Sequence, residues 1–429
     1  MPVSRSLSIT NRSVVFRKTT LPNGLRIVSE TLPSIRSVSL GVWVDVGSRH
    51  EQPEESGLSH FIEHMLFKGT RKRTAKELAS ALESLGGSLN GFTSREQTCY
   101  HSRFLDKHLE TSVDVLADLT CNATITSTHI GREKHVVCEE IRESLDNPSD
   151  HIHDIFAKSF WGKHPLGQPI MGTEQNIMSL TRSRVLDFVS RHYRAESVVV
   201  AACGAVPHEK LVKSVRQKFR LGAGASTEAT QAQRSKERDL IVERDKNNQT
   251  HFCLGFPAPG YDSRDKMSVL ALSSCLGGGM SSVLFQKIRE DRGLAYSVYT
   301  YSDFYRDSGI FGTYLATDKR HVKKALAIIL AEIRKLKKHK LSSKVLSEVK
   351  SQMQGHLILG MESTTSRMNR IARQELMSNR YQTLDQVLKE IEKVSSSGLM
   401  ELANRIFDES RTAIAVLGPV DKDILAGAR

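Results

Sequence analysis

One stretch of small and polar residues divides this chain into two halves of similar length. From about Leu221 to Glu237 the sequence LGAGASTEATQAQRSKE has no hydrophobic period, which is typical of an interdomain linker. The chain has 429 residues, whereas a single hydrophobic core rarely grows beyond about 250 to 300 residues. We therefore expect two domains, residues 1–220 and 238–429, joined by a linker at 221–237.

The two halves repeat the same order of predicted elements. In each half, a strand rich in β-branched and aromatic residues precedes an acidic turn, a helix, further strands and long helices. Aligning Gly41 with Gly255 places His60 opposite Ser274, so the second half repeats the pattern without its histidines. The sequence predicts an α+β protein with two domains of similar fold, each a mainly antiparallel sheet backed by helices.

Composition narrows the class of protein further. Hydrophobic residues make up 39% of the chain and charged residues 25%, as in soluble globular proteins, and no apolar run is long enough to span a membrane. Six cysteines stand singly, without CxxC pairs, which favours reduced thiols in a reducing compartment.

The net charge of +13 could attract nucleic acid. However, the densest basic stretch, 334–340, follows an amphipathic helical pattern without aromatics, so we expect a solvated helix end and no nucleic-acid partner.

The N-terminal arm bears on localisation. It is basic, with no acidic residue before Glu30, and lacks the apolar segment that secretion requires. Its Arg and Ser content is loosely like that of a transit peptide, but a strand pattern already begins near Leu21. We expect a retained arm on a cytoplasmic protein that has no membrane partner; the mitochondrial matrix is the alternative.

The segment His60-Phe61-Ile62-Glu63-His64 carries a metal-binding pattern. Ser56 could cap a helix whose apolar residues form a core-facing stripe. On that helix His60 and His64 lie one turn apart on one face, where both imidazoles can reach a single zinc ion. Glu63 is placed to contact a water on that ion. This HxxEH order is the reverse of the HExxH motif.

A catalytic zinc site needs a third protein ligand from another element. Residues 129–148 read as a helix with four candidate carboxylates, Glu133, Glu139, Glu140 and Glu143. Glu133 and Glu140 are two turns apart and face the same way, but geometry alone does not choose among the four. Without the upstream motif, a surface helix with acidic residues facing water would be the better interpretation.

Several stretches resemble the pitrilysin and mitochondrial processing peptidase family of inverted-motif zinc peptidases. They are SGLSHFIEHMLFKGT, GGSLNGFTSREQTCYHSRF, REKHVVCEEIRESLDNP, HPLGQPIMGT and CLGGGMSSVLFQKIREDRGLAYSVYTY. The resemblance implies one Zn²⁺ per chain, with His60, His64 and Glu140 as ligands and Glu63 as the general base. It also implies that Glu133 supports a ligand without binding the metal.

The same resemblance implies how a peptide would be held. Family members add an extended substrate to a sheet edge, which here corresponds to the strand around Asn90, the expected backbone contact. Relatives usually have alanine after that asparagine, and Gly91 departs from this. Arg289 and Tyr296 match an arginine–tyrosine pair that contacts the substrate and the developing oxyanion.

The expected activity is endopeptidase cleavage of unfolded or short peptides inside an enclosed chamber. The family also contains members that serve as non-catalytic partner or structural subunits, and this is the alternative function. Single-chain relatives are about twice as long, with one zinc site and one arginine–tyrosine pair, so we expect this chain to act as a homodimer.

Overall fold

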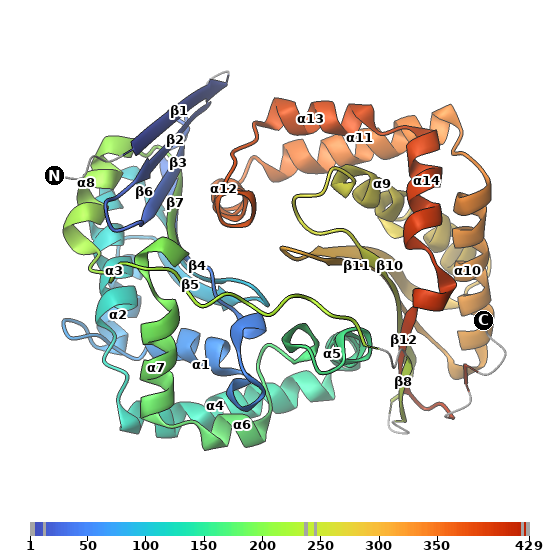
Figure 1. Cartoon of the computed structure of the whole chain (residues 1–429), viewed down its shortest axis with the longest axis horizontal. Helices are drawn as coiled ribbons and strands as arrows, with labels where there is room; N and C mark the ends of the chain where they lie inside the picture. Colours follow the sequence, from blue (N-terminus) through green and yellow to red (C-terminus); the bar gives the residue numbers. More distant parts are fainter. Residues whose placement is uncertain (1–4, 12–13, 236–238, 244–246, 422–423, 426–429) are drawn as a thin grey trace. The chain divides into compact units, whose positions relative to one another are not determined.

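The computed structural model describes residues 5–11, 14–235, 239–243, 247–421 and 424–425. The chain forms two compact units (Figure 1). The first contains residues 1–141, 169–230 and 360–381, and the second contains residues 142–168, 231–359 and 382–429.

These units differ from the expected division of the chain. Residues 142–168, placed in the first domain from sequence, belong to the second unit, and residues 360–381 belong to the first. Residues 221–235 of the expected linker contain neither helix nor strand, whereas 236 and 237 lie outside the described residues.

The first unit is built on a seven-stranded sheet. Its strands are β1 (Arg5–Asn11), β2 (Val14–Thr20), β3 (Arg26–Thr31), β4 (Ser37–Val44), β5 (Ser88–Thr93), β6 (Thr98–Leu105) and β7 (Val198–Gly204). They lie in the order β1-β2-β3-β7-β4-β6-β5, and every neighbouring pair is antiparallel except β3 and β7. The N-terminal arm thus supplies a hairpin, β1 and β2, to one edge, and β5 forms the other.

Helices lie wholly or partly in the first unit, and several of them contact its sheet. They are α1 (Leu58–Leu66), α2 (Ala75–Glu83), α3 (Leu109–Asn122), α4 (Ser127–Asp146), α6 (Glu174–Ser179), α7 (Arg182–His192), α8 (His208–Lys218) and α12 (Thr364–Ser378). Helices α1 and α2 contact β5, α3 contacts β4 and β6, and α12 contacts β3, β4 and β7. The division between the units falls inside α4, after Ile141.

Helix α12 comes from far along the chain and is held on the first sheet by a buried ionic network. Its apolar side chains, among them Met368 and Ile371, pack on the sheet beside Trp43. Glu30 on β3 is 1% exposed; it accepts hydrogen bonds from Arg367 at 3.1 Å and from the Tyr381 hydroxyl at 2.9 Å. A buried carboxylate is tolerated only when paired in this way, so Glu30 ties residues 360–381 to the first unit.

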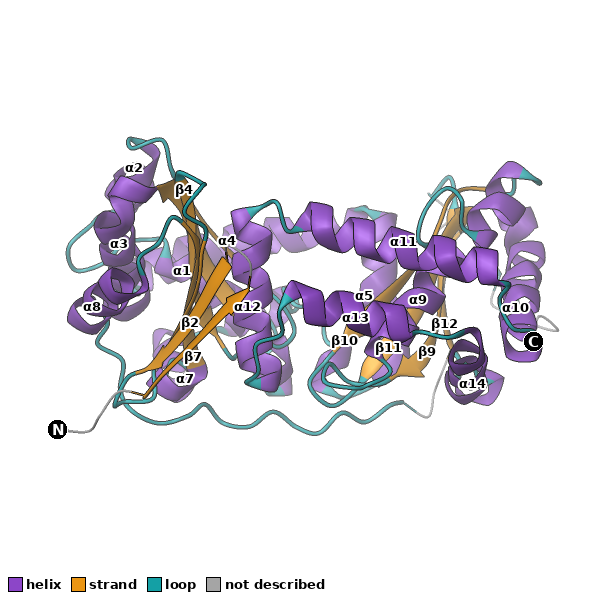
Figure 2. Ribbon diagram, turned by 90° about the horizontal axis from the view of Figure 1, so that it is seen from above, coloured by secondary structure: helices purple, strands orange, loops and turns teal. Residues whose placement is uncertain are grey.

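The second unit contains a five-stranded sheet. Its strands are β8 (Asp239–Glu243), β9 (Thr250–Ala258), β10 (Ala295–Phe304), β11 (Gly309–Thr317) and β12 (Ala413–Gly418). Its helices are α5 (Pro148–Trp161), α9 (Lys266–Gly277), α10 (Val322–Lys338), α11 (Ser343–Gly360), α13 (Leu384–Lys393) and α14 (Ser396–Ile406). Figure 2 shows the strands of each unit as one sheet with helices beside it.

The two sheets share a common strand order. In the second sheet the order is β10-β11-β9-β12-β8, and the only parallel pair among its described strands is β12 and β8. Read from the other end, β8-β12-β9-β11-β10 matches β3-β7-β4-β6-β5 in position and direction. The predicted fold class, two mainly antiparallel sheets backed by helices, is therefore confirmed, and β10 occupies the place that β5 has in the first unit.

No helix among the described residues has both the length and the apolar composition needed to cross a membrane.

Candidate metal centre

Helix α1 presents two histidines on one face. Apolar side chains bury it on most sides: Leu58, Phe61, Ile62, Met65 and Leu66 are all at most 1% exposed. The rings of His60 and His64 lie one turn apart with centroids separated by 4.6 Å, as the spacing requires. Both ring Nε2 atoms approach the same carboxylate, that of Glu140.

Glu140 lies on α4, directly opposite the histidine pair. Its Oε1 is 3.7 Å from His60 Nε2 and its Oε2 is 3.5 Å from His64 Nε2. One ligand atom from each of the three residues lies within 4.8 Å of the others, and no other such group of His, Cys, Asp or Glu occurs in the described part of the chain. Two imidazole nitrogens and one carboxylate oxygen form a donor set that suits zinc.

Glu133 approaches His64 from the other side of the ring. Its Oε1 lies 2.8 Å from His64 Nδ1, and its Oε2 accepts a hydrogen bond from Lys68 Nζ at 2.7 Å. Burial raises the pKa of this carboxyl, but the bonds to His64 and Lys68 outweigh burial and lower it. Glu133 therefore stays ionised and keeps the proton of His64 on Nδ1, which leaves Nε2 free to bind a metal.

The protonation state of His60 suits a ligand role. Burial, together with the nearby His64, lowers the pKa of His60 to about 4. His60 is therefore a neutral imidazole at pH 7, the form that binds metals. For His64, burial lowers the pKa, but the bond to Glu133 and the charges of Glu140 and Glu63 raise it overall.

Glu63 lies on the same helix, one residue before the second histidine, and is 9% exposed. Its Oε2 accepts a hydrogen bond from Thr93 Oγ1 at 2.9 Å. Burial raises the pKa of this carboxyl, although the Thr93 bond opposes the shift. A carboxylate with a raised pKa beside a metal-binding set is suited to accept and return a proton.

The edge strand β5 runs beside α1 and carries the predicted substrate contact. Asn90 is exposed, and its own Oδ1 accepts a hydrogen bond from the Gly91 amide at 2.8 Å. Strand β5 pairs with β6 alone among the described strands, so its other edge is open to an added strand.

The predicted Arg289 and Tyr296 lie side by side in the second unit. Arg289 is on a π-helix, Phe285–Glu290, and Tyr296 is near the start of the edge strand β10. The guanidinium donates a hydrogen bond to the Tyr296 carbonyl oxygen at 2.8 Å and stacks over the Tyr296 ring at 4.3 Å. The Tyr296 side chain is 73% exposed, so it is available to a ligand.

Glu51, which the sequence did not suggest, holds the start of α1. We expected Ser56 to cap this helix, but this expectation is wrong: the capping residue is Gly57, with φ of 94°, and no side chain of the capping residue bonds to the helix. Instead Glu51, which is 3% exposed, accepts hydrogen bonds from the amides of Gly57 at 2.8 Å and Ser59 at 2.6 Å. An acidic residue shortly before a helix is a weak signal of such a contact.

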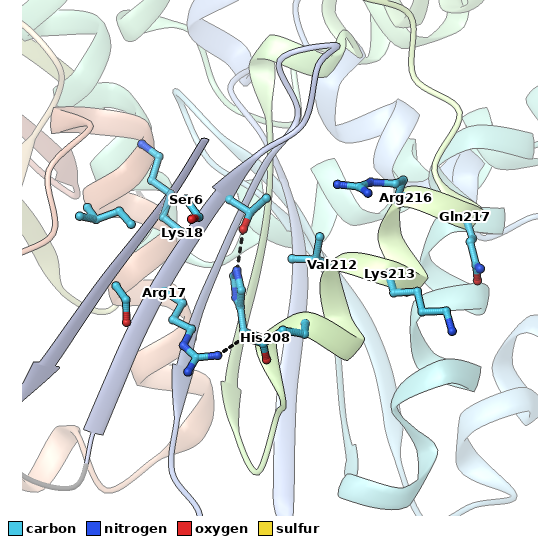
Figure 3. Close-up of a pocket in the computed structure, with 12 residues that line it drawn as sticks. Ser6, Arg17, Lys18, His208, Val212, Lys213, Arg216 and Gln217 are labelled. Carbon is cyan, nitrogen blue, oxygen red and sulfur yellow. Dashed lines mark hydrogen bonds and ion pairs between the residues drawn. The ribbon is translucent and has the colours of Figure 1, made fainter. Parts of the chain in front are cut away.

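A cavity elsewhere in the first unit does not add to the site. Its volume is ≈ 560 Å³, and it lies between β1, β2 and α8 (Figure 3). His208 on its wall lies 2.8 Å from Thr19 Oγ1 through Nε2 and 2.8 Å from Ser29 Oγ through Nδ1. Burial lowers the pKa of His208, so this histidine is neutral, and both of its nitrogens are engaged in holding the sheet to α8.

Comparison with known proteins identifies the family. The family model for insulinase (peptidase family M16) matches residues 26–174, and the model for the peptidase M16 inactive domain matches residues 179–353. An uncharacterized zinc protease of Streptomyces coelicolor is 38% identical over 94% of this chain and 90% of its own length. The chain belongs to peptidase family M16. The uncharacterized zinc protease YmxG of Bacillus subtilis is 37% identical over 94% of this M16 member and 98% of its own length.

Solved structures show the same fold at lower identity. A protease from Helicobacter pylori has a TM-score of 0.87 at 24% identity and covers 94% of this M16 chain and 99% of its own. A chain of Complex III2 from Candida albicans has a TM-score of 0.83 at 18% identity, and the match covers 94% of this chain and 96% of that one. The names of the sequence relatives imply zinc, and the fold is that of M16 peptidases.

The choice of Glu140 over its neighbour can be tested directly. Glu139 is exposed and lies about 100° around α4 from Glu140. We expect Glu140→Gln to weaken zinc affinity by at least about 100-fold, since even loss of a group that only orients a ligand costs about 10- to 100-fold. Glu139→Gln is the matched control and should bind zinc like the wild type in a chelator competition titration. Loss of zinc from the control alone would mean that the helix presents the other carboxylate.

Glu51 should make stability depend on pH. Burial raises the pKa of this carboxyl from 4.5 to about 8, so between these pH values the folded chain keeps a proton that the unfolded chain releases. The resulting stabilisation is complete below pH 4.5 and is lost as the pH rises to 8, at up to about 1.4 kcal/mol per pH unit. Glu51→Gln should remove this slope.

Denaturant unfolding of both proteins, measured with zinc removed by a chelator, checks this expectation. Relative to the variant, the wild type should lose stability steadily from pH 5 to pH 8. Parallel stability curves would contradict the role given to Glu51.

Proposed function

We propose that this M16 family member is a zinc-dependent endopeptidase that cleaves unfolded or short peptides. The observation that carries the proposal is the convergence of His60, His64 and Glu140 within 4.8 Å, with Glu63 on the same helix as the histidines. A zinc ion held there would polarise a water molecule and the substrate carbonyl. The names of the relatives support zinc protease chemistry of this type.

Other residues of the chain would transfer the proton, orient a ligand and bind the peptide. The Glu63 carboxylate accepts the proton of the attacking water and returns it to the amine of the departing peptide. Glu133 holds the proton of His64 on Nδ1 and so fixes that ring, while Lys68 keeps Glu133 in place. The open edge of β5, including Asn90, receives the peptide as an added strand.

The base assignment is tested by Glu63→Gln. We expect this variant to keep about one zinc per chain, because the three ligands remain, and to lose at least about 100-fold in turnover, because the proton acceptor is gone. Metal analysis and hydrolysis of a fluorogenic peptide measure the two quantities. Normal turnover by the variant would contradict the assignment, and a wild type that binds zinc without cleaving any member of a peptide library would favour the alternative, a non-catalytic subunit.

We further propose that the active form is a homodimer in which the zinc site of one chain works with Arg289 and Tyr296 of the partner subunit. The support is that this chain has one copy of each set, whereas the longer single-chain members that it resembles combine one of each in about twice the length. The guanidinium of Arg289 stacks on the exposed Tyr296 ring, whose hydroxyl can donate a hydrogen bond to a ligand.

Mixing two inactive variants tests this arrangement. When Glu63→Gln and Tyr296→Phe exchange subunits at equal amounts, about half of the dimers are mixed, and one site in each mixed dimer has neither defect. About a quarter of all sites should therefore regain activity, measured as peptide hydrolysis after exchange is confirmed by mass. Exchange without any regain would rule out a shared site and leave the zinc assignment untouched.

A further inference from the structure

The two carboxylate oxygens of Glu63 have different surroundings. Oε2 accepts the hydrogen bond from Thr93 Oγ1 at 2.9 Å. Oε1 faces Gly91, where an added Cβ would lie 3.0 Å from it and 3.2 Å from Glu63 Cγ. The absence of a side chain on Gly91 therefore leaves Oε1 open while Oε2 is engaged.

Thr93 is itself firmly placed. It is the last residue of β5 and pairs with Thr98 at the end of the ladder with β6. The following turn is closed by the Ser94 amide, which donates to the Gln97 carbonyl oxygen at 2.8 Å. The β-branched side chain of threonine has few rotamers, so the hydroxyl holds a fixed position against the helix.

We propose that Thr93 is a positioning residue that makes Oε1 the atom of Glu63 that takes the proton. Its hydroxyl donates a hydrogen bond to Oε2 and so fixes the plane of the carboxylate. The other oxygen, Oε1, then points towards the space beside Gly91. This inference rests on the proposed peptidase function and adds to it the atom that acts and the group that selects it.

The fixed carboxylate should matter more for turnover than for binding. Without the hydroxyl, the carboxylate can rotate about its terminal bond, and small misplacements of a catalytic group are costly. We expect Thr93→Val, which has nearly the same shape but no hydroxyl, to lower kcat by about ten-fold and to leave KM within about two-fold of the wild type. The zinc content should stay at one per chain, since the Thr93 hydroxyl bonds to Glu63 and to none of the three ligands.

Two further variants separate this role from a structural one. Thr93→Ser restores the hydroxyl and should bring kcat back to within about three-fold of the wild type. Ser94→Ala removes a neighbouring hydroxyl that bonds to Gln97 instead of Glu63 and should leave kcat unchanged. If the valine variant does not fold, Thr93→Ala, which also lacks the hydroxyl, replaces it in the same measurements.

The measurements are kcat and KM on a fluorogenic peptide, zinc per chain by mass spectrometry, and the midpoint of thermal unfolding. The proposal is supported if the valine variant loses kcat alone and the serine variant recovers it. The proposal is overturned if the kcat of Thr93→Val equals that of the wild type or if the kcat of Thr93→Ser is as low as that of Thr93→Val. Loss of zinc from Thr93→Val would also overturn it. An inactive wild type, or an active Glu63→Gln, would instead count against the proposed function itself.

Discussion

Helix α1 is packed on most sides, and several of the polar groups that it carries are held by partners inside the protein. Eight of its nine residues are buried, among them His60 and Glu63, and an unpaired polar group in such a place costs about 1 to 3 kcal/mol or more. The partners come from three other segments: Glu51 at the start of the helix, Thr93 on β5, and the carboxylates of α4. The position of the candidate site follows from these contacts.

The charge balance around the histidines favours a divalent cation. Lys68 compensates Glu133, but no lysine or arginine in the described part of the chain bonds to Glu63 or Glu140. The carboxylates of Glu63 and Glu140 repel each other, and this repulsion contributes to the raised pKa of the buried Glu63. A divalent metal ion would offset this repulsion and would be the largest charge in the site. The types of ligand and the electrostatics therefore both favour a divalent metal ion.

The parts that could be predicted from sequence are those encoded by local spacing. The HxxEH segment places two histidines on one helix face by helical geometry alone, and the repeated element order gave the fold class. The choice of Glu140 among four acids required the family resemblance, since spacing left it open. Glu51 and Thr93 were missed because a single carboxylate or hydroxyl has no period, and its partner is set by tertiary packing. Residues 142–168 and 360–381 fall in compact units other than the expected domains for the same reason: an amphipathic pattern does not specify which sheet the helix packs against.

The shared strand order gives the two units corresponding edge strands with different side chains. In the first unit the edge strand β5 brings Thr93 and an open backbone edge beside α1. In the second unit the corresponding edge strand β10 carries Tyr296, held by Arg289 from the adjacent π-helix. The position aligned with His60 is Ser274, whose hydroxyl donates to Gln352 at 3.1 Å and only links α9 to α11. An edge strand is the part of a sheet whose backbone is free to bind another chain. In the first unit the edge strand therefore lies beside the helix with the two histidines, whereas in the second unit the edge strand itself carries the exposed Tyr296.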